Sequence, residues 1–415
     1  MAAETARAWR VIVAAGIVAL ALRLLFGLTY WVDKPLTHDE REYLALAHSL
    51  ADGRGFGYSN SHATGTSQQF GRAPGYPAFL AAIGPGAPDA VSAPRRVKRA
   101  QALVGAIGVV LIGWIAFRAL GPRAAVVAAG LAAAYPPLVW IPSYVLSETL
   151  FSAFALGTSL VLQTATDRGD AARSARAGGP LALAAGALMG ASILIRPAMM
   201  VFLPLALWWL LWRRRGILGI ALLAGTVAVV SPWTVRNYRI HGRFVLVASS
   251  GGVNFWTGNH PLAIGDGDLA ANPEIKRAEI EFRRAHPGLT AEELEPLYYR
   301  DALAHIVRHP VRWAGLVARK AFYTVIPVGP SYAVHSSRYR AASIASYLLL
   351  LSLALAGVRT LWRSPSRPSA LLLMAGSAVL ASLVFFPQER YRIPIIDPAL
   401  IVCASALISQ PRSEP

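Results

Sequence analysis

Apolar residues occur along this chain in long runs that polar residues interrupt only briefly. Ten runs approach the roughly 20 residues that an α-helix needs to cross a bilayer core of about 30 Å. They fall at 9–29, 101–117, 122–141, 143–163, 180–196, 198–212, 216–235, 342–361, 369–386 and 394–409. The pattern therefore predicts an all-α, polytopic membrane protein with about ten transmembrane helices, in a single membrane domain over residues 1–415.

Two longer polar segments separate these runs. The first, residues 30–100, predicts a helical outer loop, and the second, residues 233–340, predicts an external or interfacial segment. Within the second, residues 291–308 have the apolar spacing of an amphipathic helix. Residues 311–327 are nearly apolar enough to span, but they contain Arg312, Arg319 and Lys320, and each mid-bilayer charge costs at least about 2.5–3.5 kcal/mol. We therefore expect this stretch to lie on the membrane surface.

Composition agrees with the hydrophobic pattern. The chain is 55% hydrophobic and only 15% charged, against about 25% charged residues in soluble domains. Its net charge of +18 does not indicate a nucleic-acid partner, because much of the excess lies in short loops between apolar runs. The positive-inside rule makes those loops cytoplasmic. The loop residues are Arg118, Arg123, Arg168, Arg173, Arg176, Arg213, Arg214, Arg215, Arg359, Arg363 and Arg367.

This orientation predicts a multi-pass protein of the plasma or inner membrane with both termini in the cytoplasm. Residues 30–100 and 233–340 then face the outside. Neither an internal repeat nor a helix broken at mid-membrane, which are features of many transporters, is visible in the sequence.

Two adjacent carboxylates follow the first apolar run directly. Thr37 and Glu40 have the spacing of a capping box, so one interpretation is that Asp39 and Glu40 only start a helix. The other is that Asp39 acts as a general base, held ionised at a helix N-terminus and aimed at an incoming hydroxyl. The two roles are compatible.

Arginines on the outer side could bind a phosphate. Arg72 lies in a proline-rich re-entry toward the membrane, and Arg390 and Arg392 flank Tyr391 in a short outer loop. We predict that these four residues, Tyr391 included, bind the phosphate of the donor. Arginine binds phosphate through a two-pronged fork of N–H donors. The alternative is that Arg72 and Tyr76 are interfacial residues, and that an arginine of the 388–392 loop pairs with Glu389.

A third candidate region follows the seventh apolar run. Amides and aromatic rings interleaved with glycine suit sugar binding, and they include Asn254, Trp256 and Asn259, with Arg236 shortly before. An interfacial aromatic belt with turns would give the same composition. Neither metal-ligand spacing nor a phosphate-binding glycine loop is present, so no cofactor is indicated, although dependence on a divalent metal is left open.

Taken in order, these segments resemble bacterial membrane glycosyltransferases that use polyprenyl-phosphate-linked sugars and have the architecture called GT-C. That class includes the protein O-mannosyltransferases of glycosyltransferase family 39 and the lipid A aminoarabinose transferases. The matching segments are His38–Glu40, Arg72–Pro77, Ser147–Phe151, Arg196–Pro197, Pro232–Tyr238, Gly251–Pro261 and Arg390–Pro394.

The resemblance implies inverting transfer of a sugar from a polyprenyl-phosphate donor to a hydroxyl of a glycan, lipid or protein acceptor of the cell envelope. It implies Asp39 as general base, assisted by Glu40, with Arg72, Arg390 and Arg392 near the donor phosphate. The chain lacks the large inserted external domain of the protein O-mannosyltransferases, which weighs against a protein acceptor. The competing interpretation is a transporter or flippase for lipid-linked sugars.

Overall fold

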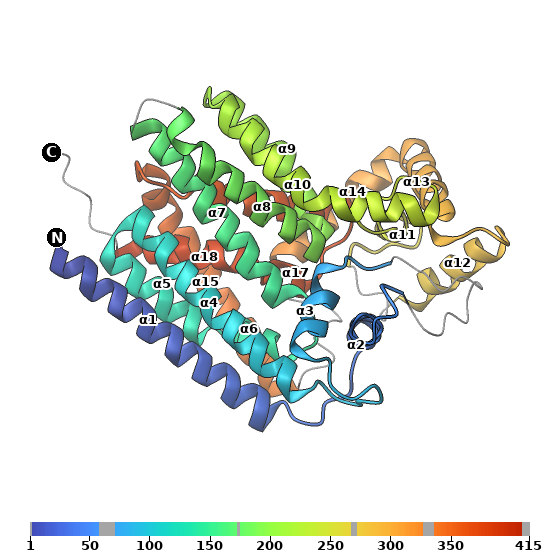
Figure 1. Cartoon of the computed structure of the whole chain (residues 1–415), viewed down its shortest axis with the longest axis horizontal. Helices are drawn as coiled ribbons and strands as arrows, with labels where there is room; N and C mark the ends of the chain where they lie inside the picture. Colours follow the sequence, from blue (N-terminus) through green and yellow to red (C-terminus); the bar gives the residue numbers. More distant parts are fainter. Residues whose placement is uncertain (1, 58–70, 172–174, 267–271, 327–335, 409–415) are drawn as a thin grey trace.

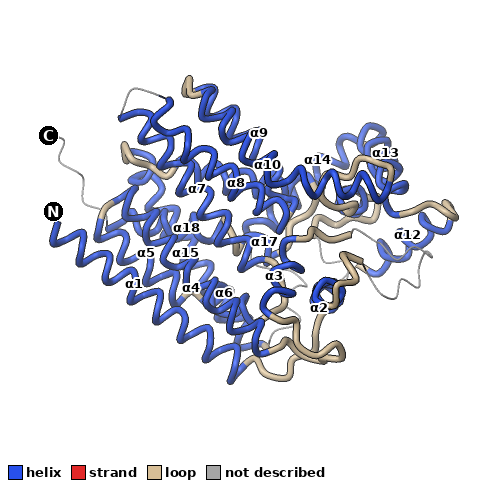
Figure 2. The backbone as a smooth tube through the Cα atoms, viewed as in Figure 1, coloured by secondary structure: helices blue, strands red, loops and turns tan. Residues whose placement is uncertain are grey.

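The structure, a computed structural model, describes residues 2–57, 71–171, 175–266, 272–326 and 336–408. Residues 58–70 of the predicted first outer loop lie outside these ranges. Within them the chain is helical, with no β-structure except one isolated bridge between Pro35 and Ser92 (Figure 2). The predicted all-α class is therefore confirmed.

A helix of the main bundle lies on each of the ten predicted apolar runs. These helices are α1 (Ala2–Leu25), α4 (Arg95–Leu120), α5 (Pro122–Ala134) with α6 (Pro136–Trp140), α7 (Glu148–Ala171), α8 (Gly179–Ile195), α9 (Phe202–Trp212), α10 (Gly216–His241), α15 (Ser337–Arg363), α16 (Ser369–Val384) and α18 (Ile396–Ser405). In the described part of the chain, five helices are long and apolar enough to cross a membrane alone, or six with a bent pair counted as one. The helices on the other runs are shorter, so the number of ten full crossings remains a prediction.

The bent pair corrects one expectation from the sequence. The chain turns by 60° between α5 and the segment Pro136–Ser143. Pro136 and Pro137 occupy the first positions after Tyr135, and proline cannot donate the backbone hydrogen bond that would continue the preceding helix. The prediction that the apolar run 122–141 is one unbroken helix is therefore wrong.

Close packing of α8 against α10 positions one end of α8 for the site described below. Gly186 lies directly against the carbonyl of Leu222, and Gly225 lies against the carbonyl of Leu183. Small residues let two membrane helices approach this closely. A side chain at either glycine would separate the helices and move Arg196, which follows the end of α8.

The remaining helices gather at the end of the bundle opposite the beginning of α1 (Figure 1). They are α2 (His38–Ala51), α3 (Gly75–Ile83), α11 (Gly251–Asn259), α12 (Pro273–Arg284), α13 (Ala291–Arg308), α14 (Pro310–Val325) and the short α17 (Glu389–Arg392). Helices α11 to α14 share a small core of their own around Trp256, Tyr298 and Leu316. The helix predicted at 291–308 is found, and α14 is not among the described helices long and apolar enough to span.

Loops that the sequence assigns to one side of the membrane meet at the other end of the bundle. Arg118 in the last turn of α4 pairs with Asp167 near the end of α7, with 2.7 Å between Nη2 and Oδ2. Ser364 after α15 donates a hydrogen bond to the carbonyl of Ala119 at 2.9 Å. The short basic loops and the outer-loop helices therefore occupy opposite ends of the molecule.

Candidate active site

Asp39 lies in the first turn of α2, and the predicted capping box holds that turn. The Thr37 hydroxyl accepts a hydrogen bond from the Glu40 backbone N–H, while the Glu40 carboxylate accepts one from the Thr37 N–H at 2.8 Å. The cap fixes the direction of the first turn, and the helix dipole favours a negative charge there. The sequence thus places an ionised carboxylate in a defined position.

Two arginines from distant parts of the chain reach Asp39. Arg72 donates from Nη2 to Oδ1 at 2.6 Å, and Arg390 donates from Nη2 to Oδ2 at 2.6 Å. Arg72 also pairs with Glu42 on α2. The side chains of Asp39, Arg72 and Arg390 are each 25% exposed, so this pairing remains accessible from outside.

Behind Arg390 lies a more deeply buried ion pair. Glu148, the first residue of α7, is 2% exposed and lies 2.9 Å from Nη1 of Arg196 and 3.6 Å from Nε of Arg390. The cation of Arg196 lies 4.3 Å from the centre of the Tyr391 ring, and that of Arg390 lies 5.5 Å from it. Tyr391 therefore packs beside both arginines.

We call Asp39, Glu42, Arg72, Glu148, Arg196 and Arg390 the arginine–carboxylate cluster. Its three carboxylates balance its three arginines, so the group is formally neutral. An added phosphate would therefore compete with the carboxylates for the guanidinium groups. This competition is the main chemical property of the arrangement.

The arginines control the protonation of Asp39. Burial by itself would raise the pKa of Asp39, but the charges and hydrogen bonds of Arg390 and Arg72 outweigh burial and hold the pKa well below its usual value. Asp39 is therefore ionised but weakly basic while both arginines remain on it.

Glu40 has a different environment from its neighbour. It is 3% exposed, and burial raises its pKa against the hydrogen bonds from Thr37 and Val145. Its Oε1 accepts the backbone N–H of Val145 at 2.8 Å, in the segment that leads into α7. The structure thus shows Glu40 joining the first outer loop to the bundle, and an assisting catalytic role remains a prediction.

The structure does not bring Arg392 to the cluster. Arg392 is 3% exposed, its Nε lies 3.3 Å from Oδ1 of Asp397, and its guanidinium lies 3.5 Å from the centre of the Tyr347 ring. It points into the bundle although it is only two residues from Arg390. This burial disagrees with the predicted phosphate-binding role of Arg392.

Two of the predicted sugar-binding residues are also buried. The indole of Trp256 is 3% exposed and donates to Asp301 at 2.7 Å. Asn259 is 1% exposed, and its Oδ1 accepts from Trp313 and Lys320, both at 3.0 Å. Both side chains are buried and hydrogen-bonded to other residues of the protein. This position disagrees with the predicted contact with a sugar.

The contacts of the other two predicted sugar-binding residues do not conflict with that role. Arg236 donates to the carbonyl of Phe56 at 3.3 Å and lies 4.5 Å from the centre of the Trp233 ring, so it borders the first outer loop. Asn254 is half-buried on α11. A sugar-binding role for these two residues stays a prediction.

Three residues of the cluster, Glu42, Glu148 and Arg196, were not among the predicted site residues. Glu148 and Arg196 are charged residues at the ends of apolar runs, and ionisable groups at membrane depth are rare and commonly functional. That signal could have identified both. Glu42 carries no such signal, because a glutamate on an exposed helix is ordinary.

The described residues contain no group of three or more His, Cys, Asp or Glu side chains placed to hold a metal ion. Within the cluster, both oxygens of Asp39 already face arginines. The residues present therefore do not form a metal site in this arrangement.

Comparison with solved structures defines the class of fold. No protein-family model and no curated protein matches the sequence. The chain has the GT-C fold of membrane glycosyltransferases. It is similar to the oligosaccharyltransferase AglB of Archaeoglobus fulgidus in complex with an inhibitory peptide and dolichol-phosphate, with a TM-score of 0.58 and 15% identity over 96% of this chain.

The apo form of the same archaeal enzyme gives a TM-score of 0.59 at 15% identity. The chain spans about half the length of these archaeal proteins, 50% in both comparisons. ArnT of Cupriavidus metallidurans bound to undecaprenyl phosphate gives a TM-score of 0.43 at 17% identity, over 96% of this chain and 77% of ArnT.

Proposed function

We propose that this chain is a membrane glycosyltransferase that moves a sugar from a polyprenyl-phosphate donor to a hydroxyl of a cell-envelope acceptor, with inversion. The observation that carries the proposal is Asp39, held at a helix N-terminus between Arg72 and Arg390 within a GT-C fold. The archaeal neighbour with this fold was solved with dolichol-phosphate, which supports a lipid phosphate as part of the donor.

In the proposed reaction, Asp39 accepts the proton of the acceptor hydroxyl. The hydroxyl oxygen forms a bond to the anomeric carbon on the face opposite the phosphate. The bond from that carbon to the phosphate oxygen breaks, and the lipid phosphate leaves with the electron pair. A guanidinium group beside this oxygen stabilises the negative charge that grows on it.

Arg390 is the stronger candidate for the phosphate. It touches Asp39 at one edge and faces Glu148 and Arg196 at the other, so rotation could carry it from the carboxylate to a phosphate. Arg72 is also paired with Glu42, and we assign it to positioning Asp39. Departure of Arg390 would raise the basicity of Asp39 at the moment the donor binds.

The test is Asp39→Asn in the purified, full-length protein, supplied with polyprenyl-phosphate-linked sugars and envelope acceptors. Removing a general base typically lowers the rate by about 10²–10⁴-fold. We expect normal folding, retained donor binding and a loss of transfer in that range. Asp52→Asn, at the exposed end of the same helix, is the matched control and should transfer sugar at the parental rate.

A flippase for lipid-linked sugars is the second candidate, and the bend between α5 and α6 is the observation that favours it. Broken helices line the substrate path in many transporters. Reconstituted protein would separate the two functions. Parental transfer by well-folded Asp39→Asn, together with movement of donor across the bilayer, would replace the enzyme proposal with the flippase.

A further inference from the structure

Lys320 of α14 carries an ammonium group that is completely buried, with an exposed fraction of 0%. A buried charge is stable only when hydrogen bonds replace its water. The ammonium group donates to Oδ1 of Asn259 at 3.0 Å and to the backbone carbonyls of Leu383 at 3.1 Å and Val384 at 3.4 Å. Lys320 therefore joins α14 to the end of α16, away from the arginine–carboxylate cluster itself.

Asn259 of α11 reaches the same end of α16. Its Nδ2 donates to the carbonyl of Val384 at 3.0 Å, while its Oδ1 accepts from Lys320. The last carbonyls of a helix have no partners within the helix and carry a partial negative charge. A lysine and an amide donor are suited to both properties. The Lys320–Asn259 pair thus holds the end of α16 from two other helices.

The chain leads directly from this contact to the cluster. Arg390 follows Val384, the last residue of α16, by six positions (390 − 384). Gly258 of α11 lies directly against the carbonyl of Phe385, so a side chain at position 258 would displace that carbonyl. Further along, Nε of Arg390 donates to Oε1 of Gln388 at 2.9 Å. The connection that brings Arg390 to Asp39 is therefore fixed where it begins.

Helix α17, which carries Arg390, has only four residues. Helices this short have little stability of their own, so the place of α17 depends on the segments that flank it. The hydrogen bond from Arg390 to Asp39 is 2.6 Å long. A misplacement of about 1 Å in a catalytic site can cost about 100-fold in rate. The position of this connection therefore matters to the proposed chemistry.

We propose that Lys320 and Asn259 are positioning residues, which hold the connection between α16 and α17 so that Arg390 stays on Asp39. The effect on sugar transfer rests on the proposed function, whereas the hold on the connection does not. Loss of the pair should loosen residues 385–390 and weaken the influence of Arg390 on Asp39.

The first measurement is hydrogen–deuterium exchange of the backbone amides of residues 385–390 in the purified, full-length protein. Lys320→Met keeps the long apolar stem and removes the ammonium group. The carbonyls that it leaves unpaired should speed exchange in this segment by about tenfold. Trp313→Phe is the matched control, because it removes another donor to Oδ1 of Asn259, at 3.0 Å, and leaves both contacts with the carbonyls of α16. Its exchange should be parental.

Asn259→Asp keeps the result clear if Lys320→Met folds poorly. The carboxylate still accepts from Lys320 and loses only the donor to Val384, so exchange should rise by less than in Lys320→Met and by more than in Trp313→Phe. Parental exchange in both Lys320→Met and Asn259→Asp would overturn the hold on the connection. That comparison decides the point even if the parent transfers no sugar, a result that would instead refute the proposed function.

The second measurement is the kinetics of sugar transfer. Lys320→Met should raise the donor KM and move the acid limb of the kcat/KM profile to higher pH, as removal of Arg390 would, but by less. A purely structural defect would lower the active fraction, and hence kcat, without moving either quantity. Faster exchange of residues 385–390 with a parental donor KM and acid limb would overturn the positioning role.

Discussion

Asp39 has two arginine partners, and each lowers its affinity for a proton. Removing one arginine while burial stays the same must therefore raise the pKa of Asp39. If Asp39 is the base, the acid side of the kcat/KM profile reports this pKa in the free enzyme. In the parent, activity should persist to lower pH than an ordinary aspartate would allow.

Arg390→Ala and Arg72→Ala should both move that acid limb to higher pH, because each removes a positive charge and a hydrogen bond from the Asp39 carboxylate. Arg390→Ala should in addition raise the donor KM, since we assign the phosphate to Arg390. The measurement is kcat/KM between about pH 4 and about pH 8. Arg95→Gln, at an exposed arginine that is the first residue of α4, is the control. An unchanged acid limb in both alanine variants would remove Asp39 from the role of base.

Only part of this residue-level arrangement could be predicted from the sequence. Asp39 and Glu40 follow from a local signal, the four-residue capping box, and Arg72 follows because it closes the same loop. The contact between Asp39 and Arg390 joins positions 351 residues apart, and no local pattern encodes such a contact. Arg390 and Arg392 are equivalent candidates in the sequence. In the short helix α17, however, Arg392 points into the bundle and Arg390 points to Asp39.

At the scale of elements, Glu40 links the start of α2 to the segment before α7. Glu40→Ala would remove an acceptor from the buried N–H of Val145, which costs about 1–3 kcal/mol, and also half of the capping box. Thr37→Ala removes only the cap, at about 0.5–2 kcal/mol. We expect Glu40→Ala to lower the unfolding temperature more than Thr37→Ala, as measured by tryptophan fluorescence in detergent.

Glu40→Gln separates this structural role from catalysis. The amide keeps one acceptor oxygen, so folding should be close to that of the parent and sugar transfer should fall less than in Asp39→Asn. A loss of transfer as large as that of Asp39→Asn, in a variant with parental unfolding temperature, would give Glu40 a direct catalytic role.

The amphipathic and apolar patterns of the sequence predicted the positions of the helices well. The side chains that a helix buries determine both its pattern in the sequence and its place in the fold. The helix at 291–308 was predicted by its stripe of apolar residues, and Leu294, Tyr298 and Ala302 are the residues it buries. The same logic fails for Trp256 and Asn259. An aromatic and amide pattern arises both in a sugar-binding surface and in a small protein core, and here the side chains belong to the core and its polar contacts.

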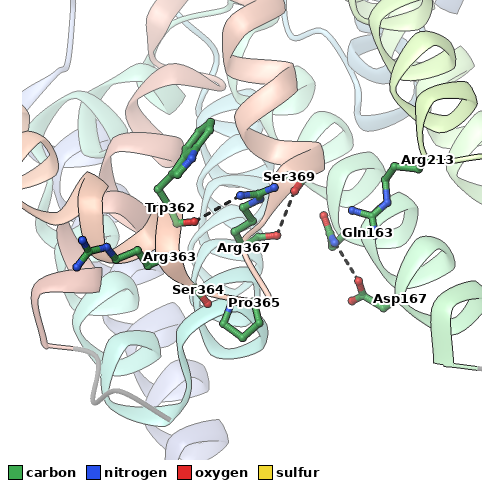
Figure 3. Close-up of a pocket in the computed structure, with 9 residues that line it drawn as sticks. All are labelled: Gln163, Asp167, Arg213, Trp362, Arg363, Ser364, Pro365, Arg367 and Ser369. Atoms are coloured by element: carbon green, nitrogen blue, oxygen red, sulfur yellow. Dashed lines mark hydrogen bonds between the residues drawn. The ribbon is translucent and has the colours of Figure 1, made fainter. Parts of the chain in front are cut away.

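At the scale of the whole molecule, the fold places two charged regions at opposite ends of one bundle. The neutral arginine–carboxylate cluster lies beside α2, and a cavity lined by Arg213, Arg363 and Arg367 (Figure 3) lies where α7, α9 and α15 end. The GT-C fold fixes this separation but not which end faces the cytoplasm. The positive-inside rule predicts the direction, because arginine-rich short loops tend to remain on the cytoplasmic side during insertion.

Cysteine labelling tests this orientation. Cys403 is buried and should react poorly in the parent, so single cysteines can be added at exposed positions. With a membrane-impermeant maleimide on intact cells, Asp52→Cys and Glu281→Cys should label, whereas Pro365→Cys should label only after lysis. Labelling of Pro365→Cys but not Asp52→Cys in intact cells would reverse the protein in the membrane. The base at Asp39 would then face the cytoplasm, and envelope acceptors on the outer surface would be out of its reach.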